Sequence, residues 1–332
     1  ADPARLAADP PDLALDHAWE ISPEEAREMA IRCESVALDS DPRITNSEGA
    51  TVATSRGVRA YGNSHGFFGA YRRSSHSVSC AVLAGDDGGM ERDYHYTASR
   101  DPAELEALEA VGAKAAERTL RRLGARQVTT AKVPVLFPPE LARGFLGHAV
   151  GAASGTAQYR RSSFLLDAAG EAVFPDFLNI RERPHIPGAI GSAPFDREGV
   201  ATTDRDLVAA GVLQGYVLSS YSARRLGRET TGNAGGVHNL LVEGNAEGFD
   251  ALVRQMGRGL VVSELMGQGV NPVTGDYSRG AAGFWVEGGE IVYPVSEITI
   301  AGNLRDLYRN IIAVGRDQDV RGVIRCGSVL VA

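Results

Sequence analysis

The sequence predicts an α+β protein of two domains, in which mixed or antiparallel sheets are flanked by few helices. Strand-like segments outnumber helix-like segments and do not alternate regularly with them, which argues against a doubly wound parallel sheet. A chain of 332 residues with 43% hydrophobic residues is long enough for two packed cores. We expect a linker at residues 1–21, a middle domain at 22–124 and a C-terminal domain at 125–332.

The middle domain is predicted to begin with a helix behind Ser22. Ser22 is a favourable N-cap, Pro23 suits the first turn, and Glu25 completes a capping box. Apolar residues then recur at helical spacing up to Cys33, which is therefore predicted to lie in the core.

Residues 51–97 are predicted to form an antiparallel meander. Short segments rich in Val, Tyr and Phe, one of them containing Cys80, are separated by glycines such as Gly57, Gly62, Gly66 and Gly69. His65, His76 and His95 fall in this region and are predicted to be exposed or in turns, although strand parity leaves open a cluster on one sheet face.

A second long helix is expected to close the middle domain. Asp101 would be its N-cap, Pro102 would lie in its first turn, Glu104 would complete a capping box, and Gly124 would end it.

The C-terminal domain is predicted to start with a strand at 127–137 and a helix that begins at Glu140. Further strands are expected at 164–167, 207–208, 212–218, 260–265 and 323–331, and a hairpin joins 281–286 to 291–295. Helices are expected at 219–226, at 246–258 behind Asn245, and at 304–314 behind Asn303.

Composition excludes several classes of protein. A formal net charge of −8 argues against nucleic acid or an anionic membrane as the main partner, because both require a basic surface. The sequence has no run of about 20 apolar residues and no signal-peptide pattern, so we expect a cytoplasmic protein. Its three cysteines, widely spaced and odd in number, fit reduced thiols better than a disulfide framework.

Residues 141–155 have the pattern of a metal-site helix without the ligands. A hydrolytic zinc site needs about three protein ligands, a water and a nearby carboxylate. The segment contains no Asp or Glu, and His148 is its only imidazole. By itself, His148 is predicted to be a packed or capping residue, and Cys326 a buried, inert thiol.

Four segments carry a resemblance that is more specific than any short motif. They are Thr231–Gly236, Met266–Glu287, Tyr293–Leu304 and Arg325–Leu330. Together with the chain from about Ser22 onward, they closely resemble the PmbA/TldE family, whose members are the partners of TldD peptidases. In that family a further α/β portion precedes the point that Ser22 resembles, so we expect such a portion in the whole protein.

The resemblance implies which chemistry has been lost. In the TldD subunit the helix carries H-E-x-x-x-H, and a cysteine near the C-terminus completes a zinc site. Here Gly147 falls at the first His, His148 at the Glu and Ala152 at the second His, while Cys326 falls at or near the cysteine. The resemblance therefore implies a vestigial site, no cofactor in this subunit, and zinc in the partner.

The leading hypothesis is a non-catalytic subunit of a TldD/TldE-type zinc metallopeptidase that acts on unfolded or leader peptides. Its partner would be a TldD-like subunit, and this chain would serve assembly and substrate admission. The alternatives are an independent hydrolase that uses His148 and Cys326 or an unrecognised metal, and a stand-alone peptide-binding module.

The Gly-rich loops lack the spacing of nucleotide-binding loops and are better suited to the close approach of another backbone. A peptide groove or subunit interface is therefore predicted around Gly267, Gly269, Asp276 and Arg279.

Overall fold

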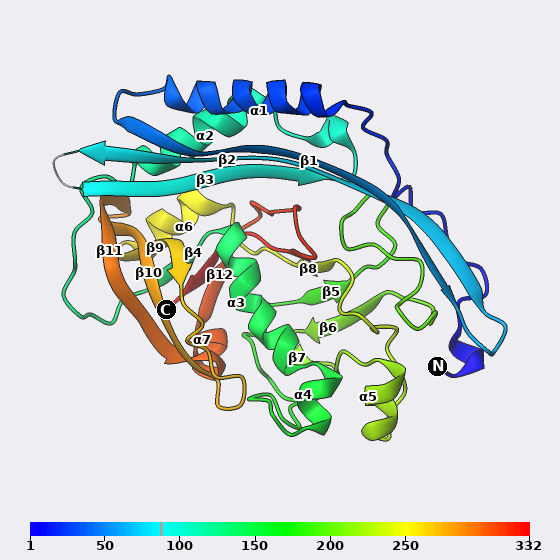
Figure 1. Ribbon diagram of the computed structural model, residues 1–332. Helices are drawn as coiled ribbons and strands as arrows, with labels where there is room; N and C mark the ends of the chain where they lie inside the picture. Colours follow the sequence, from blue (N-terminus) through cyan, green and yellow to red (C-terminus); the bar gives the residue numbers. More distant parts are fainter. Residues whose placement is uncertain (87–88) are drawn as a thin grey trace.

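The computed structural model describes residues 1–86 and 89–332. Within these residues the chain forms three β-sheets flanked by few helices, as the sequence predicts (Figure 1). No helix in this part of the chain has the length and apolar character needed to cross a membrane.

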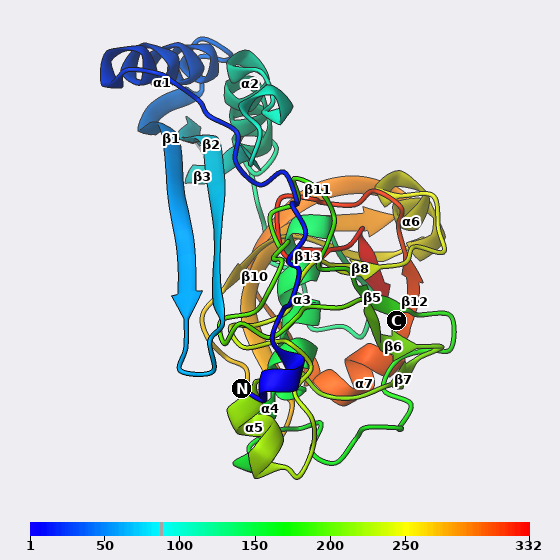
Figure 2. The ribbon, with the colours of Figure 1, turned by 90° about the vertical axis from the view of Figure 1, so that its right-hand side faces the viewer.

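The first sheet has three antiparallel strands, in the order β1 (Ile44–Gly62), β2 (Phe68–Asp86) and β3 (Gly89–Ser99). Alternate residues of β2 point into a core that also receives side chains from α1 (Pro23–Leu38) and α2 (Leu108–Leu120). Both helices therefore cover the same face of the sheet (Figures 1 and 2). Cys33 and Cys80 are buried in this core, which confirms the prediction for Cys33.

The expectation of short strands was wrong, because β1 and β2 each span 19 residues. Gly57, Gly62 and Gly69 take ordinary extended conformations inside the ladder and do not interrupt it. Only Gly66, with φ of +84°, lies in the tight connection between the two strands. A glycine is a turn signal only where the backbone enters the left-handed region.

The expectation of exposed histidines was wrong for two of the three. His76 and His95 are 1% and 9% exposed, whereas His65 is exposed in the turn. The N-terminal segment covers His76: His76 Nε2 is 2.9 Å from the carbonyl oxygen of His17, and the Trp19 ring packs edge-on against the imidazole at 5.5 Å. A contact between residues so distant in sequence could not be found from strand parity.

The second helix starts later than expected. Asp101 caps only a 3-10 turn at Pro102–Glu104, and α2 begins at Leu108. The backbone is extended at Leu105, whose side chain packs against the core, and Glu106 points to His95 with an Oε2–Nε2 distance of 3.1 Å. Tertiary contacts therefore override the local helix signal.

The C-terminal part contains two sheets that share one apolar core with α3 (Pro139–Ala152). A six-stranded mixed sheet runs, from edge to edge, through β11 (Glu290–Asn303), β10 (Asp276–Glu287), β9 (Gly259–Met266), β4 (Val135–Phe137), β14 (Val329–Val331) and β12 (Ile311–Val314). A five-stranded sheet runs through β13 (Ile324–Arg325), β8 (Leu240–Val242), β5 (Ile180–Glu182), β6 (Arg205–Ala209) and β7 (Val212–Leu213). The hairpin β10–β11 confirms the predicted pairing and extends it in both directions.

Several expected elements are shorter or different. Residues 127–134 are not in a sheet, residues 164–167 form a turn, and the strand at 212–218 is reduced to β7. The three short helices are α5 (Ser220–Arg225), α6 (Phe249–Met256) and α7 (Leu304–Arg309), and the chain continues from α7 into strand β12. The N-cap of α6 is Gly248, not Asn245, whereas Asn303 does cap α7 as predicted.

The expected terminal strand at 323–331 is divided between the two sheets. β13 pairs with β8, and β14 lies between β4 and β12. The chain crosses from one sheet to the other at Gly327, where a Cβ atom would lie 2.1 Å from the carbonyl oxygen of Gly315. A residue with a side chain would clash at this crossing, so position 327 requires glycine.

Candidate functional site

The helix α3 is fixed in the core by aromatic side chains. Phe145 stacks on Phe137 with ring centroids 4.8 Å apart, and it meets Tyr308 edge-on at 5.0 Å. The Tyr308 hydroxyl donates to the Phe145 carbonyl oxygen at 2.8 Å. Residues 142, 145, 146, 149 and 152 form the buried face of the helix, as the helical period requires.

Charged side chains fix the first turns of α3 against the three-stranded sheet. Arg143 Nη2 donates to the Tyr96 hydroxyl at 2.6 Å, and Arg143 Nη1 lies 3.3 Å from Asp319 Oδ2. Arg321 pairs with Asp319, donates to the Tyr96 carbonyl oxygen and lies over the Tyr96 ring. Burial would raise the pKa of Asp319, but the hydrogen bonds and charges of Arg321 and Arg143 outweigh it and lower the pKa.

The opposite face of α3 is lined by glycines. Gly144, Gly147 and Gly151 are spaced three and four residues apart, so they share one side of the helix. A Cβ atom at Gly144 or Gly151 would meet no neighbour within 4 Å in the described part of the chain, and at Gly147 it would meet only Ile324 Cδ1, at 3.8 Å. Packing therefore does not require these glycines.

His148 lies beside this glycine face and is half-buried. Its ring meets the Tyr277 ring edge-on at 6.1 Å. Burial, followed by the positive charge of Arg279, lowers the pKa of His148 below its usual value, so the imidazole is neutral at neutral pH. The Tyr277 hydroxyl next to it is buried, and it has no hydrogen-bond partner among the described residues.

Cys326 lies at the other end of α3. Its side chain is fully buried, and the thiol donates to the carbonyl oxygen of Pro139 at 3.8 Å. Burial, reinforced by the charge of Asp319, raises the pKa of Cys326 to about 12, so the thiol stays protonated. It is therefore a poor nucleophile.

The structure does not pair Cys326 with His148. Pro139 and His148 are nine residues apart in one helix, which corresponds to roughly 13 Å along its axis. No group of three or more His, Cys, Asp or Glu side chains suited to a metal ion is present in residues 1–86 and 89–332. Whether Gly147, His148, Ala152 and Cys326 are the remains of a metal site stays a prediction.

The predicted groove residues lie in and next to the loop that enters β10. Gly269 is packed so closely that a Cβ atom would lie 1.8 Å from the carbonyl oxygen of Ser278. Asp276 accepts from Thr274 and Asn303, and Arg279 donates to the carbonyl oxygens of Leu265 and Met266. Gly267 takes a positive φ of +76° in the same loop. The backbone that approaches Gly269 is thus the protein's own strand β10.

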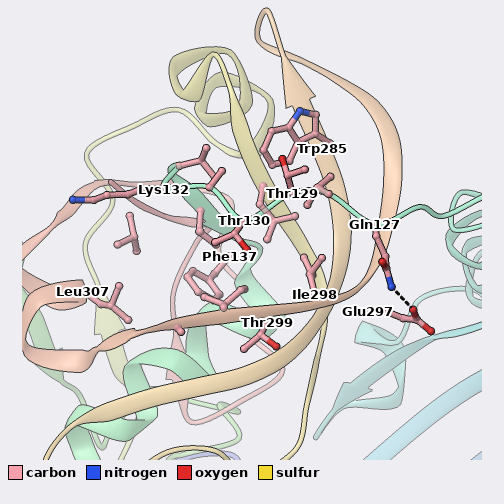
Figure 3. Close-up of a pocket in the computed structure, with 18 of the residues that line it drawn as sticks. Gln127, Thr129, Thr130, Lys132, Phe137, Trp285, Glu297, Ile298, Thr299 and Leu307 are labelled. Carbon is pink, nitrogen blue, oxygen red and sulfur yellow. Dashed lines mark hydrogen bonds between the residues drawn. The ribbon is translucent and has the colours of Figure 1, made fainter.

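The structure also has a cavity that the sequence did not indicate, lined by residues from β4, β9, β10, β11 and β14 of the six-stranded sheet. It has a volume of about 640 Å³ and lies between β11 and residues 127–133 (Figure 3). Gln127 Nε2 donates to Glu297 Oε2 at 2.6 Å at one side of the cavity, and Lys132 lies at the opposite side of the view. Residues 127–133 have the composition of a strand, and the sequence therefore predicts a strand there. In the structure they are not in a sheet, and they form one wall of the cavity.

Comparisons with known proteins agree with this architecture. The family model of the PmbA/TldA metallopeptidase central domain matches residues 16–123, and that of the PmbA/TldA metallopeptidase C-terminal domain matches residues 130–332. Metalloprotease PmbA of Escherichia coli is 53% identical over 330 residues, which cover 99% of this chain and 73% of that protein. The PmbA homolog of Haemophilus influenzae is 49% identical, with the same coverage.

Solved structures show the same fold. A putative modulator of DNA gyrase from Bacteroides thetaiotaomicron superposes with a TM-score of 0.94 at 31% identity, covering 100% of this chain and 76% of that one. TldE from Thermococcus kodakarensis superposes with a TM-score of 0.83 at 22% identity, covering 94% and 74%. Both domain models match the chain in order, and the two relatives are 53% and 49% identical to it. The chain therefore belongs to the PmbA/TldD family of metallopeptidases.

Proposed function

We propose that this chain is the non-catalytic subunit of a TldD/TldE-type zinc metallopeptidase that cleaves unfolded or leader peptides in the cytoplasm. Its TldD-like partner would supply the zinc and the catalytic groups. This chain, with no cofactor of its own, would support assembly and the admission of peptide.

The glycine face of α3 is the observation that carries the proposal. By resemblance, Gly147 and Ala152 stand where the catalytic sister has its two histidines. Gly147 has room for a side chain, so its glycine is not explained by crowding. A bare helix surface lets another backbone approach closely, which suits a surface that faces a partner or a peptide.

The hydrolase alternative is disfavoured by the state and position of the two groups it needs. A nucleophilic cysteine requires a thiolate within hydrogen-bond reach of its base. The Cys326 thiol is buried with a raised pKa and contacts the first turn of α3, whereas His148 packs against Tyr277 farther along the helix.

Co-expression with the TldD-like subunit of the same organism tests the proposal. We expect the two chains to copurify, with zinc near one per pair, carried by the sister. An unstructured fluorogenic peptide should be cleaved by the pair and far more slowly by either chain alone. Gly151→Leu should weaken the complex or its activity, while Ala113→Leu, at an exposed position of α2, should not.

Two results would contradict the proposal. One is about one zinc per isolated chain that disappears in Cys326→Ser, since two remaining ligands make only a weak site. The other is a sister subunit that degrades unfolded peptides alone as fast as the pair does.

A further inference from the structure

We propose that the cavity between β11 and residues 127–133 binds a short peptide in extended form, as a strand added to the free edge of β11. This inference rests on the proposed function for its substrate class, a peptide. The proposed peptide site is separate from the candidate site at α3, because the cavity is not lined by Gly147, His148, Ala152 or Cys326.

The backbone on both sides of the cavity is unpaired. At one end Arg126 bridges to β11: its N–H donates to the Pro294 carbonyl oxygen at 3.2 Å, and its own carbonyl accepts from Ser296 at 3.3 Å. At the other end Leu260 donates to the Pro134 carbonyl oxygen. Between these points, residues 127–133 have no backbone hydrogen bond within the described part of the chain, and residues 298–302 pair only with β10.

A bulge separates the paired part of this edge from the open part. The register of β11 shifts between Val295 and Ile298, and Glu297 takes a φ of +53°, which is unusual for a residue with a side chain. Bulges end strand pairing and redirect side chains, and they are frequent next to binding sites. Here the bulge ends the pairing with Arg126 at the mouth of the cavity.

The cavity has the size and polarity that suit a peptide strand. Its volume of about 640 Å³ lies within the usual range for ligand sites. Apolar side chains line it, among them Phe137, Leu260, Trp285 and Ile300. The five residues 297–301 of β11 extend for about 16 Å at 3.3 Å per residue, which is the length of a pentapeptide.

The two ends of the cavity carry opposite charges. Glu297 lies at one end, and Lys132 at the other is exposed and has no ion-pair partner among the residues described (Figure 3). A free amino group would be favoured near Glu297 and a carboxylate near Lys132. We therefore expect a directional site that binds a short peptide with free termini.

Calorimetric titration of the isolated chain with the pentapeptide Ala-Val-Thr-Val-Ala tests the site. In an edge-bound strand only every second N–H faces the neighbouring strand. Two peptides are compared, one methylated at the backbone nitrogens of its odd-numbered residues and one at those of its even-numbered residues. One of them should bind about tenfold or more weakly, and the other should bind nearly as well as the unmodified peptide. Weaker binding of both peptides, or of neither, would overturn the strand-addition geometry.

Variants of the protein locate the site. Ala131→Trp fills the cavity from the exposed segment and should abolish binding, while Val292→Trp, on an exposed part of β11 outside the cavity, should not. Glu297→Gln and N-acetylation of the peptide should each weaken binding about threefold to tenfold. Because both changes remove the same contact between a carboxylate and an amino group, the two changes together should weaken binding no more than either alone. Binding that is unchanged in Ala131→Trp would overturn the assignment.

The experiments can contradict the peptide site and the proposed subunit function independently of each other. If the pentapeptide does not bind at about 1 mM while the chain still copurifies with its sister and is required for proteolysis, the peptide site is wrong and the proposed function stands. If the pentapeptide binds with the expected parity but the sister works equally well alone, the peptide site stands and the proposed function is wrong.

Discussion

At the scale of single residues, burial decides which ionisable side chains of the candidate site are charged. His148 is neutral because burial and the charge of Arg279 lower its pKa, and the Cys326 thiol is protonated because burial raises its pKa to about 12. Neither residue has the charge state of an activated base and nucleophile pair.

The lowered pKa of His148 predicts a pH dependence of stability. In the unfolded chain a histidine takes up a proton near pH 6.5, whereas in the native state it does so only at lower pH. Its contribution to stability is therefore present above about pH 6.5 and is lost as the pH falls further, because the unfolded chain then binds more protons. His148→Phe should show a shallower loss of the free energy of unfolding between about pH 7 and pH 5 than the wild type.

Urea unfolding at several pH values measures this difference. His65→Phe, in the exposed turn, is the matched control and should keep the wild-type slope. An unchanged slope in His148→Phe would mean that the imidazole is not desolvated in the native state.

At the scale of elements, α3 combines a tightly packed face with one that packing leaves free. Phe145 on the buried face contacts Phe137, Tyr308 and Tyr277, while Gly147 on the other side has space for a methyl group. A glycine inside a helix costs stability relative to alanine because it loses more backbone freedom on folding.

Gly147→Ala should therefore stabilise the isolated chain by about 0.5–1 kcal/mol. Gly112→Ala in α2 is the contrasting variant: its Cβ atom would lie 2.2 Å from the Cys33 carbonyl oxygen, where α1 and α2 meet, and it should destabilise. Urea midpoints of the two variants decide the point, and a destabilised Gly147→Ala would show that this face is more crowded than the structure indicates.

At the scale of the whole molecule, a charged cluster joins the three-stranded sheet to the C-terminal part. Arg143 and Arg321 connect Asp319 to Tyr96 of β3, and Arg118 of α2 pairs with Glu140 at the start of α3. Asp319 is only 7% exposed, so removing its charge leaves the partly buried Arg143 without an ion-pair partner among the described residues, and it leaves Arg321 only Glu140, at 3.6 Å.

Asp319→Asn should therefore lower the free energy of unfolding at pH 7 by about 1–3 kcal/mol. Because the native pKa of Asp319 is lowered, its contribution is present above the unfolded pKa near 3.9 and is lost as the pH falls through the native value. The difference between variant and wild type should accordingly narrow below about pH 4.

Asp167→Asn is the control for this experiment. Asp167 forms an exposed ion pair with Arg161 at 3.8 Å and should change stability by less than about 1 kcal/mol. Equal effects of the two substitutions would show that the cluster does not hold the two parts together.

The sequence by itself determined the elements whose signals are local, together with the family. The Ser22–Glu25 capping box starts α1, and the hairpin β10–β11 forms across its Gly-rich turn, because caps and tight turns are made by neighbours in the chain. Only the tertiary structure decided the break before α2, the burial of His76, the division of residues 323–331 between two sheets and the open edge of β11. Each of these depends on hydrogen bonds and packing between residues far apart in sequence, such as His17 with His76, Gly327 with Gly315 and Arg126 with Val295, and no local pattern encodes such pairs.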